Sequence, residues 1–127
     1  MSKILVVDDD PVVRKNLAIL LERAGYEADQ ASDGVEAVEK LNQQKFDLVL
    51  SDILMPRMDG HALIAHIGSH WPETRIIMMT AYFQSEADRK FIAAGADDFI
   101  GKPIMFDDLL AKIERTLNRS VPTNQNN

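Results

Sequence analysis

The chain has 127 residues, of which 46% are hydrophobic and 27% charged, enough for one domain with a buried core and too few for two. Its formal net charge of −6 gives no electrostatic basis for nucleic-acid binding, and the absence of cysteine excludes disulfides, thiolate metal sites and a cysteine nucleophile. No apolar run approaches the roughly 20 residues that a membrane span needs, and the N-terminus lacks a signal-peptide pattern. We therefore expect a cytoplasmic protein with no membrane contact.

Residues 4–7 form a near-continuous apolar run, which is typical of a strand buried on both faces of a sheet. A helix is predicted next, because Asp10 and Pro11 supply an N-cap and a first-turn proline. The helical spacing of apolar residues continues to Gly25, where the helix should end. Residues 26–31 mix small and polar side chains, and we interpret them as an edge strand.

A second helix is predicted after Asp33, because Glu36 lies three residues later in the spacing of a capping box. Residues 46–50 are another continuous apolar run and predict a buried strand. A third helix is expected from near Gly60, with Trp71 and the proline after it at its end.

Residues 75–79 predict the fourth strand and residues 98–101 the fifth, with a helix from near Ser85 to Gly95 between them. The last helix, at residues 106–117, carries its apolar residues along one face. The polar residues 120–127 show no periodicity. We therefore assign residues 1–119 to one domain and residues 120–127 to a disordered tail or the start of a linker.

Five strands alternating with five helices imply a three-layer α/β sandwich with right-handed crossovers. In such sheets ligands bind at the carboxyl ends of the strands. The residues found there are Asp8 and Asp9 after the first strand, Asp52 after the third, Thr80 after the fourth and Lys102 after the fifth. Each is ordinary by itself, as a turn former, a strand residue or a surface lysine, but their joint occurrence at one edge favours a common site.

The chemistry of these side chains indicates how they could be used together. Three carboxylates with one lysine leave a net negative hole, which suits a hard divalent cation such as Mg²⁺. With Mg²⁺ bound, an aspartate can act as a nucleophile toward phosphorus. The metal, Lys102 and Thr80 would then hold the three phosphoryl oxygens, and stabilising the charge on them is the main requirement of phosphoryl transfer.

Four segments, "ILVVDDDP", "LVLSDILMPRMDG", "IIMMTAY" and "AGADDFIGKP", together make the sequence resemble the receiver domain of bacterial two-component response regulators, from about Lys3 to Leu117. The resemblance implies a flavodoxin-like fold, with a five-stranded parallel sheet of order 2-1-3-4-5. It also implies Mg²⁺ as the cofactor, with Mn²⁺ able to substitute for it.

The resemblance assigns a role to each acidic position. Asp52 matches the phosphoacceptor of the family. Asp9 matches the direct metal ligand, and Asp8 matches the acidic residue that acts mainly through water. The backbone carbonyl of Leu54 matches the third protein ligand of the metal.

The remaining positions match the parts that respond to the phosphoryl group. Thr80 matches the switch hydroxyl, and Lys102 matches the lysine that pairs with the phosphate. Phe99 matches the switch aromatic residue, which would rotate inward when Thr80 moves. The bond between Lys102 and Pro103 matches a peptide bond that is usually cis in the family.

The function that the resemblance implies is a signalling switch. A phosphohistidine of a histidine kinase or a histidine phosphotransfer protein would give its phosphoryl group to Asp52. The face made by the fourth helix, the last strand and the last helix would then change shape toward an output domain or a partner protein. A homodimer driven by phosphorylation is left open. The protein would not be a conventional enzyme, because it would catalyse only its own phosphorylation and dephosphorylation.

Three alternatives are left open by these residues. An aspartyl-nucleophile phosphatase shares Mg²⁺ and an Asp nucleophile, but it typically has a second Asp where this chain has Leu54. A flavodoxin-like binding module would need a phosphate-cradling loop after the first strand, where this chain has acids. A degenerate receiver acting only as a scaffold is disfavoured by the complete set of five residues.

Two further pairs of residues carry weaker predictions. Leu54 and Tyr82 lie at positions where family members differ in dephosphorylation rate, and their bulk predicts hindered access of water and a long-lived phosphoryl group. His66 and His70 are four residues apart, as in a two-ligand metal site. Because no third ligand is near them, we interpret them as surface histidines.

Overall fold

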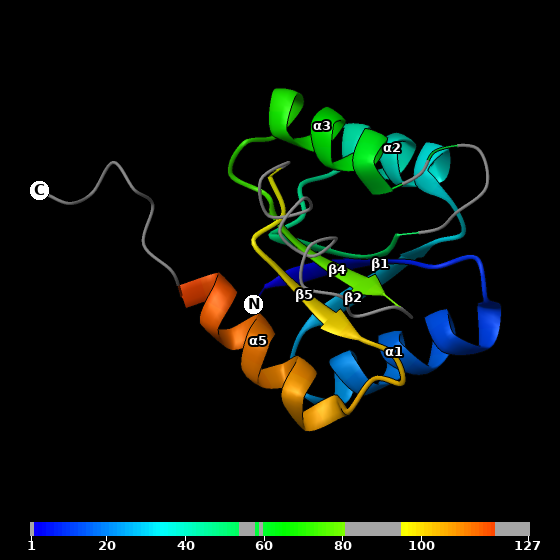
Figure 1. The fold of residues 1–127 in the computed structure, drawn as a ribbon, viewed down its shortest axis with the longest axis vertical. Helices are drawn as coiled ribbons and strands as arrows, with labels where there is room; N and C mark the ends of the chain where they lie inside the picture. Colours follow the sequence, from blue (N-terminus) through cyan, green and yellow to red (C-terminus); the bar gives the residue numbers. More distant parts are fainter. Residues whose placement is uncertain (1, 54–57, 59, 81–94, 119–127) are drawn as a thin grey trace, which may run out of the picture.

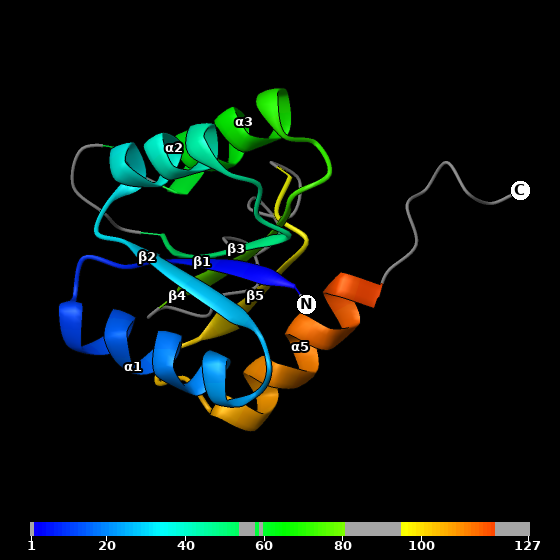
Figure 2. The same ribbon diagram turned by 180° about the vertical axis from the view of Figure 1, so that it is seen from behind.

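The computed structural model describes residues 2–53, 58, 60–80 and 95–118 (Figures 1 and 2). In chain order the elements are β1 (Lys3–Val7), α1 (Pro11–Arg23), β2 (Glu27–Ala31), α2 (Gly34–Gln43), β3 (Leu48–Asp52), α3 (Gly60–His70), β4 (Arg75–Thr80), β5 (Asp98–Gly101) and α5 (Phe106–Asn118). The five predicted strands and four of the predicted helices are confirmed. The helix predicted from near Ser85 lies outside the described residues. None of the helices in the described ranges combines the length and the apolar character needed to cross a bilayer.

The strands form one parallel sheet of order β2-β1-β3-β4-β5, which confirms the fold expected from the resemblance. Figure 1 shows α2 and α3 in one layer above the sheet and α1 and α5 in another layer below it. The strands β1, β3 and β4 are therefore covered by a helical layer on both faces, which is the physical reason for their nearly continuous apolar sequences, whereas the edge strand β2 is less buried and more polar.

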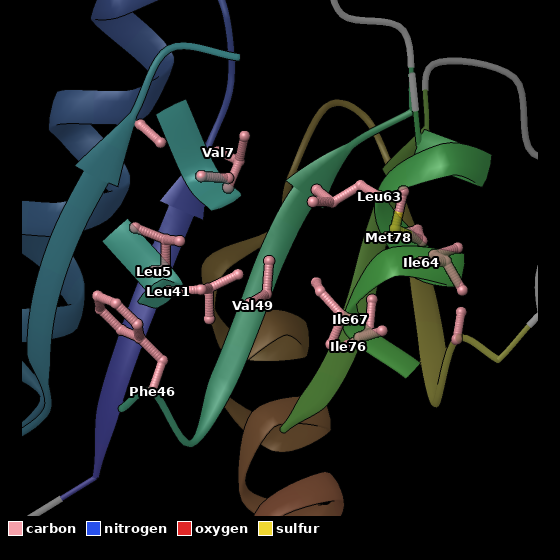
Figure 3. Close-up of a cluster of buried hydrophobic side chains, with 13 residues drawn as sticks. Leu5, Val7, Leu41, Phe46, Val49, Leu63, Ile64, Ile67, Ile76 and Met78 are labelled. Atoms are coloured by element: carbon pink, nitrogen blue, oxygen red, sulfur yellow. The ribbon is translucent and has the colours of Figure 1, made fainter. Parts of the chain in front are cut away.

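The buried side chains divide into two clusters, one on each face of the sheet. Successive strand residues alternate between them, so Leu5 and Val7 pack toward α2 and α3, whereas Ile4 and Val6 pack toward α1 and α5. Figure 3 shows the first cluster, in which Phe46 lies near Leu5 and Leu41. Phe46 was predicted to be a strand residue, but β3 begins at Leu48. Phe46 instead precedes the strand and is buried with 2% of its surface exposed, which explains the apolar signal.

The helix ends follow the capping residues of the sequence. Asp10 Oδ1 accepts a hydrogen bond from the backbone N–H of Val12 at 2.9 Å, and Asp33 Oδ1 accepts one from Glu36 at 2.8 Å. Gly25, just after α1, has a φ of 100°, a conformation that favours glycine. Because α1 and α2 start within a few residues of the ends of β1 and β2, the two loops that join these elements are short and are anchored by the capping aspartates.

Candidate functional site

The parallel register brings the carboxyl ends of four strands to one edge. It pairs Val7 with Ser51, Asp52 with Met79, and Thr80 with Gly101. The residues that follow or end these strands therefore become neighbours, although the chain separates the first from the last by more than ninety positions. The predicted gathering of polar side chains at this edge is what the structure contains.

Three aspartates at this edge form a group that could hold a metal ion. Carboxylate oxygens of Asp8, Asp9 and Asp52 all lie within 4.8 Å of one another. Asp8 is fully buried, Asp52 is half-buried and Asp9 is exposed, so the cluster opens to solvent on the side of Asp9. Within the part of the chain that the structure describes, no other three acidic, histidine or cysteine side chains converge in this way.

Lys102 joins two of these carboxylates. Its Nζ donates hydrogen bonds to Asp8 Oδ2 and to Asp52 Oδ2, each at 3.1 Å. Burial alone would lower the pKa of Lys102, but the hydrogen bonds to Asp52 and Asp8 outweigh it and raise that pKa above its usual value. Lys102 therefore remains an ammonium group held between two acids.

Asp8 behaves differently from an ordinary ion-paired aspartate. Its burial raises its pKa above the usual value, although the backbone N–H of Asp10, at 2.9 Å, and Lys102 both act to lower it. Three carboxylates and one ammonium leave two negative charges of the cluster without a cationic partner within it. An all-oxygen set of this charge fits a hard divalent cation such as Mg²⁺.

The loop that carries Asp8 is held by contacts that the sequence did not reveal. Arg14, one turn into α1, donates from Nη1 to the carbonyl oxygen of Asp8 at 2.9 Å and from Nε to Gln30 at 3.2 Å. The N–H of Asp8 donates to the carbonyl oxygen of Ala31 at 3.2 Å. Arg14 thus joins α1 to the end of β1 and to β2, and the third bond joins the end of β1 to the end of β2. The only signal for Arg14 was its position four residues after the cap of α1.

The predicted switch residues lie on β4 and β5, the two strands that end at this edge next to Asp52 and Lys102. Thr80 ends β4 with 7% of its surface exposed, and its carbonyl oxygen accepts the N–H of Lys102 at 2.7 Å. Phe99 is opposite Met78 in the sheet register and packs, half-buried, against the cluster on the α2 and α3 side. The bond between Lys102 and Pro103 is cis.

Some predicted positions do not belong to this group or cannot be placed in it. Leu54 and Tyr82 lie outside the described residues. His66 and His70 lie on the last turns of α3, with their rings stacked at a centroid distance of 4.0 Å and Trp71 tilted against both. The side chain of His70 is exposed and that of His66 is half-buried, and no third histidine or acid of the described ranges joins them.

A family model described as the response regulator receiver domain matches residues 4–114. Response regulator MprA of Mycobacterium leprae is 37% identical over 120 residues, which make up 94% of this chain and 53% of that protein. The chain thus spans about half the length of the curated relatives it matches.

Solved structures agree with the sequence comparison. Chemotaxis protein CheY4 of Vibrio cholerae is 34% identical with a TM-score of 0.86, over 91% of this chain and 98% of that one. The receiver domain of the Francisella response regulator 1452 is 28% identical with a TM-score of 0.88, over 94% of this chain and 98% of that one. With an acidic cluster and a lysine at the carboxyl edge of a parallel sheet of this order, the chain belongs to the family of two-component response regulator receiver domains.

Proposed function

We propose that this receiver domain works in the cytoplasm by accepting a phosphoryl group on Asp52, from a phosphohistidine of a histidine kinase or a histidine phosphotransfer protein. The observation that supports this most directly is the spacing of its acidic group, in which Asp8, Asp9 and Asp52 approach within 4.8 Å while Lys102 contacts two of them. A carboxylate oxygen of Asp52 would form the bond to phosphorus as the bond from phosphorus to the imidazole nitrogen breaks. That nitrogen leaves with the electron pair.

Asp8, Asp9 and Asp52 would hold Mg²⁺, or Mn²⁺ in its place, together with the backbone carbonyl of Leu54. When bound, the ion neutralises charge on the phosphoryl oxygens. The two uncompensated charges of the cluster and its all-oxygen donors support this choice of metal. The raised pKa of Asp8 supports it too, because a buried carboxylate whose charge is poorly solvated gains from a nearby cation.

Lys102 and Thr80 would hold the remaining phosphoryl oxygens. The ammonium of Lys102 already contacts Asp52, the proposed acceptor, at 3.1 Å. Thr80 lies at the end of the neighbouring strand, and Phe99 is within the same pair of strands. A movement of the Thr80 hydroxyl toward the phosphoryl group and of Phe99 into the vacated space would then alter the face that includes β5 and α5.

An apolar groove beside Lys102 supports a protein as the phosphoryl donor. Its volume is about 300 Å³, and it lies between α1 and the segment that joins β5 to α5. The lining residues are Val13, Asn16, Leu17, Leu20, Lys102, Pro103 and Ile104. Val12 and Met105, nearby in the chain, expose 66% and 65% of their surface. We assign the groove to the phosphohistidine-bearing protein, because an apolar surface next to the acceptor would be covered during the transfer.

The proposal also divides the chain. Residues 1–119 form the receiver domain, and residues 120–127 form a tail or begin a linker toward an output domain. The length of the curated relatives, of which the chain spans about half, supports an output domain as the downstream partner. A homodimer formed after phosphorylation is the other downstream arrangement to test.

The direct test uses acetyl phosphate, a small phosphoryl donor, with Mg²⁺ and mass spectrometry of the intact protein. The expected result is one added phosphoryl group that Asp52→Asn abolishes and that EDTA prevents. The matched control is Asp107→Asn, which changes an exposed aspartate in the first turn of α5 and should leave the modification unchanged. A parent protein that stays unmodified with both acetyl phosphate and a panel of phosphorylated histidine kinases would contradict the proposal.

A further inference from the structure

Gly34, the first residue of α2, lies directly against Met58. A Cβ atom at Gly34 would be 2.6 Å from Cβ of Met58, 2.7 Å from its carbonyl oxygen and 2.9 Å from its Cγ. Non-bonded carbon atoms normally approach to about 3.5–4.0 Å. Because one of the close atoms belongs to the backbone, a new rotamer of Met58 could not relieve the contact, and one of the two segments would have to move.

The glycine is needed here for space and not for its backbone freedom, since its φ lies outside the left-handed region. The start of α2 is also fixed in place. Asp33 is buried and caps the helix through the N–H of Glu36 at 2.8 Å. Met58 packs, half-buried, against the hydrophobic cluster on the same face of the sheet. A side chain at Gly34 would therefore press two anchored segments apart.

These two segments lead to the acidic group from opposite sides. Three residues before Gly34, the carbonyl oxygen of Ala31 accepts the N–H of Asp8 at 3.2 Å. Met58 follows Asp52 by six residues, and Ile53, next to Asp52, packs against the same cluster as Met58. The contact between Gly34 and Met58 thus joins the start of α2, just after β2, to a residue that lies six positions after Asp52.

We infer that Gly34 is a positioning residue for the proposed phosphoryl transfer: its missing side chain lets the segment after Asp52 approach the turn after β2, and this approach sets the spacing of the three aspartates. The inference rests on the proposed function. Residues that orient metal ligands commonly change metal affinity by about 10–100-fold when they are altered. A displacement at this contact should act on the metal site in the same way.

The test variant is Gly34→Ala, and the measured quantity is the Mg²⁺ concentration that gives half-maximal phosphorylation by acetyl phosphate. We expect it to rise roughly tenfold or more. The matched control is Gly68→Ala, because Gly68 lies in α3 and a Cβ there would meet nothing within 4 Å. Thermal unfolding of each variant is measured in parallel, since a purely structural role would lower the midpoint without changing the Mg²⁺ requirement.

A second pair of variants tests the contact itself. Met58→Gly removes two of the three close atoms and leaves only the carbonyl oxygen. In the Gly34→Ala background it should bring the Mg²⁺ requirement part of the way back toward the parent value. If Gly34→Ala alone does not fold, the double variant is compared with Met58→Gly, and the double variant should still need more Mg²⁺.

The results distinguish a failure of the positioning role of Gly34 from a failure of the proposed function. If the parent is phosphorylated and Gly34→Ala shows the parent's Mg²⁺ requirement, the positioning role is overturned and the proposed function stands. A double variant that matches Met58→Gly overturns it as well. If the parent itself takes up no phosphoryl group, the proposed function has failed before Gly34 is tested.

Discussion

Two aspartates of this domain each form an ion pair with a lysine, but their pKa values shift in opposite directions. Asp29 Oδ1 lies 2.9 Å from Lys40 Nζ, and Asp8 Oδ2 lies 3.1 Å from Lys102 Nζ. Burial acts to raise the pKa of Asp29, but the hydrogen bonds from Lys40 and from the backbone of Gln30 hold it below the usual value, whereas the pKa of Asp8 is raised. The lysine contact alone therefore does not determine the state of the acid.

The difference lies in burial and in the sharing of the lysine. The Asp29 side chain keeps 34% of its surface exposed and has its own lysine, while that of Asp8 has 0% exposed and shares Lys102 with Asp52. A partly exposed aspartate with a lysine of its own gains little from a further cation. A buried aspartate that shares its lysine gains more, which supports the metal-binding role proposed for Asp8.

The largest difference between the two ion pairs should appear in the rate of phosphorylation when each lysine is removed in turn. Lys102→Met is expected to slow phosphorylation by acetyl phosphate by roughly 100-fold to 1,000-fold, because a preorganised donor to the transferring oxygens is lost. Lys40→Met should leave the rate unchanged. Rapid-quench measurements at saturating Mg²⁺ provide the test, and equal rates for the two variants would show that Lys102 has no special role.

The gain in the free energy of unfolding on Mg²⁺ binding should depend on Asp8 and not on Asp29. At a concentration one hundred times its dissociation constant, a ligand that binds only the folded state adds about 2.7 kcal/mol to the free energy of unfolding. We expect this gain in the parent and in Asp29→Asn, and a much smaller gain in Asp8→Asn. Urea unfolding with Mg²⁺ and with EDTA measures it. A full gain in Asp8→Asn would remove Asp8 from the metal site.

The pH dependence of stability, measured in EDTA, should have opposite signs for the two residues. The folded-state pKa of Asp29 is below 3.8, so its stabilising contribution is present above that pH and is lost as the pH falls through the folded value. The folded-state pKa of Asp8 is above 3.8, so the folded state binds the proton more readily, and stability falls as the pH rises through this window.

The variants make this contrast measurable. At neutral pH without Mg²⁺, Asp29→Asn should be less stable than the parent and Asp8→Asn more stable. Both differences in stability from the parent should become smaller as the pH is lowered. The difference for Asp8→Asn should disappear at a higher pH than the difference for Asp29→Asn. Thermal unfolding between pH 3 and pH 7, a range set around the ordinary aspartate pKa of about 3.9, follows them. Differences of the same sign would refute the assignment of burial as the dominant influence on Asp8.

The smallest effect on stability is expected for a substitution outside both ion pairs, and it serves as the baseline for the other variants. Gly68→Ala in the exposed face of α3 should raise the free energy of unfolding by about 0.4–1 kcal/mol, because it restricts the unfolded chain without meeting any neighbour. Chemical denaturation detects a change of this size. A loss of stability would show that α3 has less room at this position than the structure gives it.

Local patterns predicted most of the elements and the three aspartates and the lysine that gather at the edge. The apolar runs reflect burial on both faces of the sheet. Asp10 and Asp33 predict the starts of α1 and α2 to within a few residues. The sheet order came from the resemblance to a family, since nothing within a single strand specifies its neighbours. The start of the third strand was placed two residues early, because Phe46 is buried without being a strand residue.

The contacts that support the site could not be predicted in this way. Arg14 bonds a carbonyl oxygen of the preceding loop, and Gly34 faces a residue 24 positions later in the chain. Both interactions depend on how separate segments are placed in space. Periodicity and capping signals report only what happens within one segment.

The helix α5 begins close in sequence to the lysine of the acidic edge and extends away from it. Its first residue, Phe106, follows Lys102 by four positions, and Figure 1 shows the helix running from the arrowhead end of β5 back along the lower layer. At about 1.5 Å per residue, its 13 residues form a rod of about 20 Å. Lys112 and Arg115 brace this rod against Asp98 at 3.5 and 3.9 Å. Since these two ion pairs tie the later turns of α5 to the first residue of β5, a tilt of the helix that begins near Lys102 would have to break them before it displaced Asn118.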